Sequence, residues 1–250
     1  MHDAHVHLDF MANGKQVAAD AAAVGTLLFA NTVTPGGFVS ARARFDTCEN
    51  VSVGWGMHPW WVDAQAELSL PPIPAETRFV GEVGLDFGTR HAASRDIQIR
   101  VFERIARQCA EQGGKVLSIH SVRAAREVLD MLESCGTLET CTCVFHWYTG
   151  PSDQLKRAID AGCLFSVGPR MLATSKGREY VKAIPPSRLL LETDAPPGED
   201  VEYSYAELHA DLERVGNAFF AIKGAPILET VDTTFRALFA EEDGALNTER

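Results

Sequence analysis

Six residues of metal-binding type stand in short apolar segments of this 250-residue chain. His5 and His7 are two residues apart, so an extended strand would direct both side chains to the same face. Glu82 lies inside an apolar run, where a buried carboxylate without a partner is energetically costly. The three others each end a separate apolar run, and these are His120, His146 and Asp194. A lone buried histidine is usually a hydrogen-bonded core residue, but six ligand-type residues in such runs predict a metal site.

The mixture of imidazoles and carboxylates predicts two divalent cations, with Glu82 as the bridge between them. The first cation would be bound by His5, His7 and Asp194, and the second by His120 and His146. Two neighbouring cations stabilise the attacking and leaving oxygens of a hydrolytic reaction. We therefore expect Glu82 and Asp194 to be catalytic, with Asp194 as the base for the attacking water. These ligands accept Zn²⁺, Mn²⁺ or Mg²⁺, so the sequence leaves the metal open.

The candidate ligands belong to eight short, β-rich apolar runs that alternate with amphipathic stretches. The runs cover residues 2–8, 25–33, 51–57, 79–85, 115–120, 143–148, 163–168 and 188–194. This alternation predicts βα units on a parallel sheet. In a (β/α)8 barrel, side chains at the C-terminal ends of the strands converge on one site. The sequence thus predicts an α/β fold, a single (β/α)8 TIM barrel of the metal-dependent hydrolase type, with residues 1–250 as one domain.

Helical periodicity fills most of the connections between these runs. The predicted helices cover residues 94–112, 121–134, 151–161, 202–222 and 226–240. Ser94 is the expected N-cap of the first of these helices, and Gly113-Gly114 is its expected stop signal. The Pro-rich connection 58–78 is expected to be mostly irregular.

Charge and composition restrict the classes of partner. The net charge is −11 with a pI near 5.2, whereas a protein that follows a long duplex by phosphate contacts normally has a basic surface. A polyanionic substrate would therefore meet a small contact area near one scissile bond. No apolar run approaches the roughly 20 residues that span a bilayer. With no export signal and no CxxC pair among its six cysteines, the chain is expected to be cytoplasmic, with reduced thiols.

Six short segments in a fixed order resemble the TatD-type metal-dependent deoxyribonucleases, a branch of the amidohydrolase-like barrels. They are DAHVHLD (3–9), GMHP (56–59), VGEVGLDF (80–87), SIHS (118–121), FHWYTG (145–150) and LETDAP (191–196). The segments extend over nearly the whole chain. The resemblance implies that the family's ligand positions correspond to His5, His7, Glu82, His120, His146 and Asp194. It also implies that His58 contacts a substrate phosphate.

The chain departs from the family pattern in two places. Residues 197–202 are short and acidic, where family members carry a longer stretch rich in Arg, Asn and Pro. The SIHS segment is followed by Val122-Arg123, where many relatives carry an Arg-Asp pair. Together with GCLFSVGP (162–169) and Lys176-Gly177, these changes resemble the TatD-like component of Qat anti-phage systems. That narrower resemblance implies partner proteins in a defence complex.

The favoured function is a deoxyribonuclease of the 3′–5′ exonuclease type, which cleaves phosphodiester bonds at DNA ends or in single-stranded DNA. Arg123 is expected to contact phosphate, and the other basic candidates are Arg170, Lys176 and Arg178. Trp147 or Tyr148 should face the site and stack on a base, whereas Trp60 and Trp61 are expected to be structural. One alternative is an amide or ester hydrolase acting on a small molecule or an aminoacyl end, because the fold alone does not decide the chemistry. The other is a non-enzymatic, metal-stabilised subunit of a defence complex.

Overall fold

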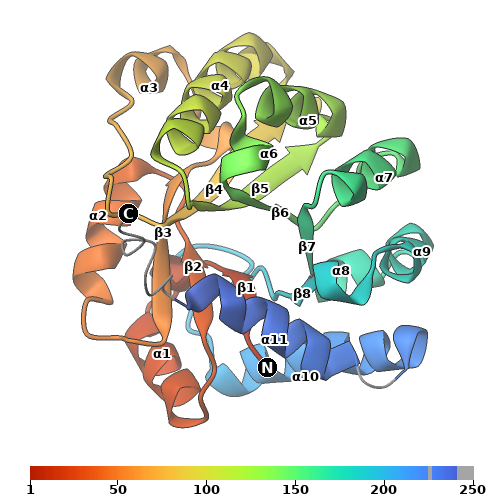
Figure 1. Cartoon of the computed structure of the whole chain (residues 1–250). Helices are drawn as coiled ribbons and strands as arrows, with labels where there is room; N and C mark the ends of the chain where they lie inside the picture. The colour runs from red at the N-terminus through yellow and green to blue at the C-terminus, as the bar shows by residue number, and fades with distance from the viewer. Residues whose placement is uncertain (225–226, 241–250) are drawn as a thin grey trace, which may run out of the picture.

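Eight parallel strands follow one another in chain order around a single sheet, so that each pairs with the next (Figure 1). The computed structural model of the chain describes residues 1–224 and 227–240. The strands are β1 (Asp3–Val6), β2 (Leu28–Asn31), β3 (Val51–Met57), β4 (Phe79–Asp86), β5 (Val116–Val122), β6 (Thr142–His146), β7 (Leu164–Val167) and β8 (Leu189–Leu191). All eight fall within or overlap the predicted runs, which confirms the predicted barrel class.

The segment after β8 closes the barrel against β1. The backbone N–H of Asp194 donates to the carbonyl of His5 at 2.8 Å, and the N–H of His7 donates to Ala195 at the same distance. The carboxylate of Asp3 strengthens this seam, since it accepts hydrogen bonds from both the backbone and the hydroxyl of Thr193. The first and last ligand-bearing segments are therefore held side by side.

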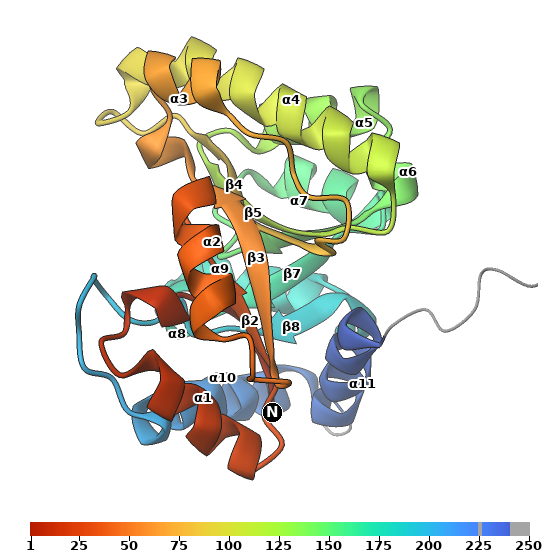
Figure 2. The ribbon, with the colours of Figure 1, turned by 90° about the vertical axis from the view of Figure 1, so that its left-hand side faces the viewer.

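Helices cover the outside of the sheet (Figures 1 and 2). They are α1 (Gly14–Ala23), α2 (Pro35–Arg44), α3 (Ala64–Ser69), α4 (Arg95–Gln112), α5 (Ala125–Ser134), α6 (Thr137–Thr140), α7 (Ser152–Asp160), α8 (Pro169–Leu172), α9 (Ser175–Ala183), α10 (Tyr205–Lys223) and α11 (Ile227–Phe239). Short 3-10 turns are η1 (Leu8–Phe10), η2 (Pro59–Trp61), η3 (Ala92–Ser94) and η4 (Pro186–Arg188). Within the described residues, no helix combines the length and the apolar character needed to cross a membrane.

The five predicted helices correspond to α4, α5, α7, α10 and α11, whereas α1, α2, α6, α8 and α9 have no counterpart among the predicted ranges. The helix predicted for 121–134 begins only at Ala125, because Ser121 and Val122 still pair with β4. Ser94 occupies the N-cap position of α4, but its side chain makes no capping hydrogen bond and its hydroxyl donates to His91 instead. The mostly irregular connection 58–78 contains η2 and α3. The first residue of the predicted helix 226–240 lies outside the described residues, as do 225 and 241–250 of the predicted domain.

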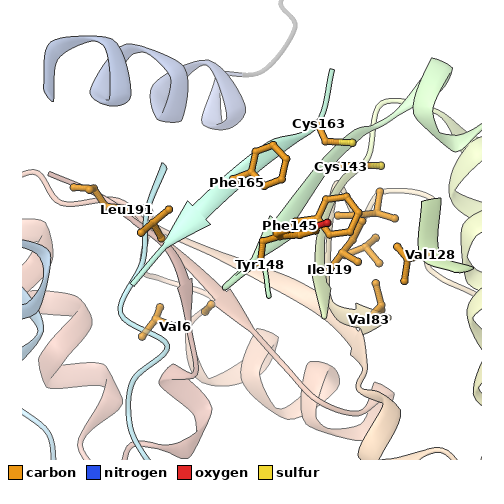
Figure 3. Close-up of a cluster of buried hydrophobic side chains, with 14 of the residues drawn as sticks. Val6, Val83, Ile119, Val128, Cys143, Phe145, Tyr148, Cys163, Phe165 and Leu191 are labelled. Atoms are coloured by element: carbon orange, nitrogen blue, oxygen red, sulfur yellow. The ribbon is translucent and has the colours of Figure 1, made fainter. Parts of the chain in front are cut away.

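The larger hydrophobic core lies between the sheet and its helices. The outward-facing side chains of β6 and β7, among them Phe145 and Phe165, pack there with Tyr148 (Figure 3). Cys143 and Cys163 belong to the same cluster, and both are free and buried. Burial of these apolar faces fixes the strands in place, so the residues at their ends are held with little freedom.

A second, smaller core fills the N-terminal end of the barrel interior. Its strand residues are Ala4, Phe29, Phe79, Val116, Val144, Leu164 and Leu190. Phe235 and Leu238 of α11 pack against them and cover this end of the barrel (Figure 1). Since the floor of the barrel is apolar and closed, the polar inward residues gather toward the opposite, C-terminal end.

Candidate metal centre

Every second side chain of β5 faces the barrel interior, and these inward residues lead from the apolar floor to the site. Val116 belongs to the floor. Ser118, the next inward residue, places its hydroxyl 2.7 Å from Nδ1 of His5. His120 follows, with Nδ1 2.8 Å from Oε1 of Glu82. A strand that alternates inward and outward therefore carries an apolar, a hydroxyl and an imidazole group in succession.

His5 and His7 face one another across the end of β1, as their spacing predicts. Their Nε2 atoms are 3.2 Å apart. The opposite ring nitrogens are engaged elsewhere: Nδ1 of His7 donates to the carbonyl of Asn31 at 3.0 Å, and Nδ1 of His5 bonds to Ser118. With Nδ1 of His7 engaged in this way, Nε2 is the ring nitrogen left to bind a cation, which is the usual arrangement of a metal-binding histidine. Oδ1 of Asp194 completes this group, 3.9 Å from His5 Nε2 and 3.6 Å from His7 Nε2.

Glu82 lies at the centre of the site with one carboxylate oxygen toward each side. Its Oε2 is 3.3 Å from His5 and 3.4 Å from His7. Its Oε1 is close to three further imidazole nitrogens, at 2.8 Å from His120, 3.2 Å from His58 and 3.0 Å from His146. The side chain is 4% exposed. This arrangement is the one expected of a carboxylate between two cation sites.

His58 and Asp86 extend the His120 side of the site. His58, assigned to substrate by the resemblance, lies directly among the ligand-type residues and not apart from them. Asp86 was not predicted, yet its Oδ2 is 3.2 Å from Nε2 of His120 and accepts the indole N–H of Trp60 at 2.6 Å. The signal for Asp86 was its place at the end of β4, four residues after Glu82.

Glu192 is a second residue of the site that the sequence analysis does not single out. It is buried behind His146, with Oε2 3.7 Å from Nδ1 of that ring. Its carboxylate also accepts hydrogen bonds from the hydroxyl of Ser166 and from the backbone N–H of Trp147. The alternation that identifies Asp194 as inward-facing also identifies Glu192, two residues earlier, and that signal was available in the sequence.

The electrostatics of the site favour positive charge between the carboxylates. Burial opposes ionisation of Glu82, but imidazoles led by those of His58 and His146 hold its pKa well below the ordinary value. Burial also opposes ionisation of Asp194, and the hydrogen bond to His7 is the largest effect that lowers its pKa to about 2. Against burial, the same carboxylates raise the pKa of His7 to about 10. Burial lowers the pKa of His58 to about 4, which leaves that imidazole neutral.

The donor atoms fit divalent cations. Among the described residues, three groups bring their ligand atoms within 4.8 Å of one another: His5, His7 and Asp194; His58, Glu82 and His120; and His5, His146 and Glu192. Imidazole nitrogen together with carboxylate oxygen is a typical donor set for zinc and related metals. Two residues of this region, Asp194 (φ 54°) and Trp147 (φ 37°), have left-handed backbone conformations, which are strained for residues with side chains.

A pocket of about 800 Å³ opens over these residues. Of the predicted substrate-binding residues, His58 and Trp147 line it, whereas Arg123 is exposed at the end of β5 and is not part of the lining. Trp60 and Trp61, which are expected to be structural, also line it, with 53% and 39% of their surface exposed.

The remaining aromatic and basic candidates separate into two sets. Tyr148 is buried in the core, which leaves Trp147 as the member of that pair at the site. Arg170 lines the pocket, and its guanidinium is 3.1 Å from Oδ2 of Asp194. Lys176 and Arg178 are not part of the lining: Lys176 donates to the backbone carbonyl of Thr149, itself a lining residue, and Arg178 donates to that of Leu172.

Comparison with known proteins places this site in a family. A family model described as "TatD related DNase" matches residues 2–239. A "Deoxyribonuclease Tat-D" of Schizosaccharomyces pombe is 35% identical over 116 residues, covering 46% of this chain and 37% of that protein. An "Uncharacterized metal-dependent hydrolase TatD" of Mycobacterium tuberculosis is 30% identical over 215 residues, covering 78% of this chain and 80% of that protein. A "3'-5' ssDNA/RNA exonuclease TatD" of Musicola paradisiaca is 33% identical over 150 residues, covering 56% of this chain and 55% of that protein.

The alignments to the Schizosaccharomyces and Musicola proteins thus span less than two thirds of those relatives' own length. The solved structure of YjjV, a TatD homologue from Escherichia coli, matches this structure with a TM-score of 0.75 at 22% identity, covering 94% of this chain and 95% of that one. At this identity the likeness shows the fold alone, and that fold is the barrel described above. The family match includes every ligand-type residue of the site. The chain belongs to the TatD-related DNase family of metal-dependent hydrolases.

Proposed function

We propose that the chain is a two-metal deoxyribonuclease that removes nucleotides from DNA ends in the 3′–5′ direction. The observation that carries the proposal is the position of Glu82, whose two oxygens face two separate sets of histidine nitrogens. In this proposal Glu82 would lie between the two cations. His5, His7 and Asp194 would hold one of them, and His120 and His146 would hold the other, with His58 adjacent.

The cations themselves would be Mg²⁺, Mn²⁺ or Zn²⁺, and the donor set is compatible with each. When bound, they would supply Lewis-acid stabilisation of the attacking and leaving oxygens of the phosphodiester. The protein's part is to hold the positive charge of the cations at a fixed place, and buried ligand residues at the ends of packed strands do this well.

Asp194 is the proposed proton acceptor. Its Oδ1 faces the His5–His7 pair, whereas its Oδ2 faces the pocket and Arg170. An attacking water in the pocket can therefore give its proton to Oδ2 while Oδ1 remains directed at the cation site. Arg170 is then placed to pair with a phosphate oxygen of the substrate, since its guanidinium already lies 3.1 Å from that carboxylate oxygen.

Support for DNA as the substrate comes from the relatives. The Schizosaccharomyces protein is named a deoxyribonuclease and the Musicola protein a 3′–5′ single-stranded DNA and RNA exonuclease. The pocket of about 800 Å³ over the ligands has room for a strand end. The narrower Qat resemblance, its partner proteins, a cytoplasmic location and a phosphate contact of Arg123 stay predictions.

The test is digestion of single-stranded DNA labelled at the 5′ or the 3′ end by purified protein with Mg²⁺, Mn²⁺ or Zn²⁺. Stepwise shortening of the 5′-labelled strand, with early release of the 3′ label, is the expected result. Early release of a 5′ label would contradict the direction alone. Hydrolysis of amides or aminoacyl esters without any digestion of DNA would contradict the proposed nuclease.

A further inference from the structure

Trp60 and Trp61 are large aromatic side chains exposed at the pocket. Their rings are nearly parallel, with centroids 6.2 Å apart and planes 21° apart. The ring of His91 lies parallel to Trp60, with centroids 5.1 Å apart and planes 8° apart. The three rings form a row beside the ligand histidines, and its two tryptophans line the pocket. We call this row the aromatic shelf.

The aromatic shelf is held in place before any substrate binds. The indole N–H of Trp60 donates to Asp86 at 2.6 Å, and the other oxygen of Asp86 accepts the backbone N–H of Gly88. The ring of His58 meets both tryptophans edge-on, with centroid distances of 5.0 and 5.3 Å. A surface fixed in this way loses little side-chain entropy when a ligand stacks on it.

Positive charge is scarce around the same pocket. Among the described residues of the lining, Arg170 is the one lysine or arginine, and Glu199 adds a negative charge. The guanidinium of Arg170 already lies near Asp194 and over the ring of Trp147, 5.4 Å from its centroid. The chain as a whole carries a net charge of −11. Beyond the metal centre and Arg170, the lining therefore offers aromatic rings for recognition and few charged groups.

We propose that the aromatic shelf stacks on an unpaired nucleobase of the strand end whose phosphodiester lies at the metal centre. This inference rests on the proposed nuclease function and adds that the base itself is required. A base inside a duplex has both faces covered by its neighbours, so only an unpaired or frayed end can supply a free face. Stacking is tolerant of sequence, because every base has a π face, and strengthens binding roughly 5- to 150-fold per base.

The experiment compares kcat/KM for two oligonucleotides, one intact and one abasic at its last two 3′ positions. The wild-type protein should prefer the intact strand by at least about 10-fold. Trp61→Leu should reduce this ratio to nearly one, and Trp61→Phe, which restores a ring, should recover most of it. Trp61 is the better test than Trp60, because Trp60 also donates to Asp86.

Leu68→Ala is the matched control, since Leu68 is an exposed apolar residue of α3 outside the pocket lining, and it should keep the wild-type ratio. The ratio of kcat/KM for the intact strand to kcat/KM for the abasic strand separates stacking from a general effect on the site. Damage to the site lowers kcat/KM for both strands together. Equal use of intact and abasic strands by the wild type would overturn the aromatic shelf while leaving the nuclease proposal intact. An unchanged ratio in Trp61→Leu would do the same. Failure to digest either strand would instead contradict the nuclease function and this inference with it.

Discussion

Oε2 of Glu192 lies 3.7 Å from Nδ1 of His146, on the side of the ring opposite to Glu82. Oε1 of Glu82 is 3.0 Å from Nε2 of the same ring, so the imidazole is enclosed by two carboxylates. Glu192 also holds Ser166 and the backbone of Trp147. Glu192 therefore contacts both His146, a proposed metal ligand, and the backbone of Trp147 in the wall of the pocket.

The charge of Glu192 should strengthen metal binding through His146. Glu192→Gln keeps the size of the side chain but removes the charge that supports the ring, so affinity for divalent cations should fall about 10- to 100-fold. Competition with a chromophoric chelator measures this directly. The control is Glu199→Gln, which removes a carboxylate from the exposed rim of the same pocket and should leave affinity near wild type. Equal affinities for all three proteins would remove Glu192 from the support of the metal centre.

Glu82→Gln should abolish hydrolysis while the barrel still folds. The amide has nearly the same volume, but it removes the negative charge between the two groups of histidines, so kcat should fall by orders of magnitude. Thermal unfolding provides an independent measurement, because a bound cation raises Tm by an amount set by its concentration and Kd. The wild type should gain Tm on addition of Mn²⁺ or Zn²⁺, and the variant should gain little. Turnover near the wild-type value would contradict the bridging role.

Much of the fold could be predicted because the buried strands are short apolar runs between amphipathic stretches. The start of α5 could not. Residues 121–134 have a helical pattern, but Ser121 and Val122 gain more from pairing with Leu85 and Asp86 of β4. That pairing becomes visible only when the neighbouring strand is in place.

The ligand-type residues were predictable because imidazoles and carboxylates are unusual in buried strands. The residues around them depend on tertiary structure. Arg123 is three residues from His120 in sequence, yet its left-handed backbone (φ 54°) and its exposure leave it outside the pocket lining. Trp60 and Trp61 follow a buried strand, which predicts a structural role, although the connection turns them toward the pocket. Sequence distance from a ligand is therefore a poor guide to substrate contact.

Arg170 and Arg123 should respond differently to the length of the substrate. Arg170→Ala should raise KM for trinucleotides and for long strands alike, because Arg170 lines the pocket. It should also reduce the log–log salt dependence by about 0.7, the change for one phosphate contact on a single strand. Arg123→Ala should raise KM and reduce the salt dependence only for strands that extend past the pocket mouth. If Arg123→Ala impairs trinucleotides as strongly as Arg170→Ala does, the distinction is wrong.

A separate prediction concerns acid stability and His2, which is buried at the closed end of the barrel. Nδ1 of His2 accepts the backbone N–H of Leu27 at 3.0 Å, and Nε2 lies 2.9 Å from Oδ1 of Asp232. Burial lowers the pKa of His2 from 6.5 to about 4 in the folded protein, and Asp232 offsets this only in part. Protonation at Nδ1 would also remove the hydrogen bond from Leu27.

Because the folded pKa lies below the unfolded one, the neutral imidazole stabilises the fold fully above about pH 6.5, and this stabilisation is lost as the pH falls toward 4. Between pH 7.5 and 5, the protonation of His2 in the unfolded chain should lower the free energy of unfolding by about 2 kcal/mol. Urea unfolding of metal-free protein at the two pH values should show a smaller drop in His2→Gln than in the wild type, by about this amount. His209→Gln, which changes a partly exposed imidazole on α10, should keep the wild-type drop. Equal drops in all three proteins would mean that His2 takes up its proton as readily in the folded barrel as in the unfolded chain.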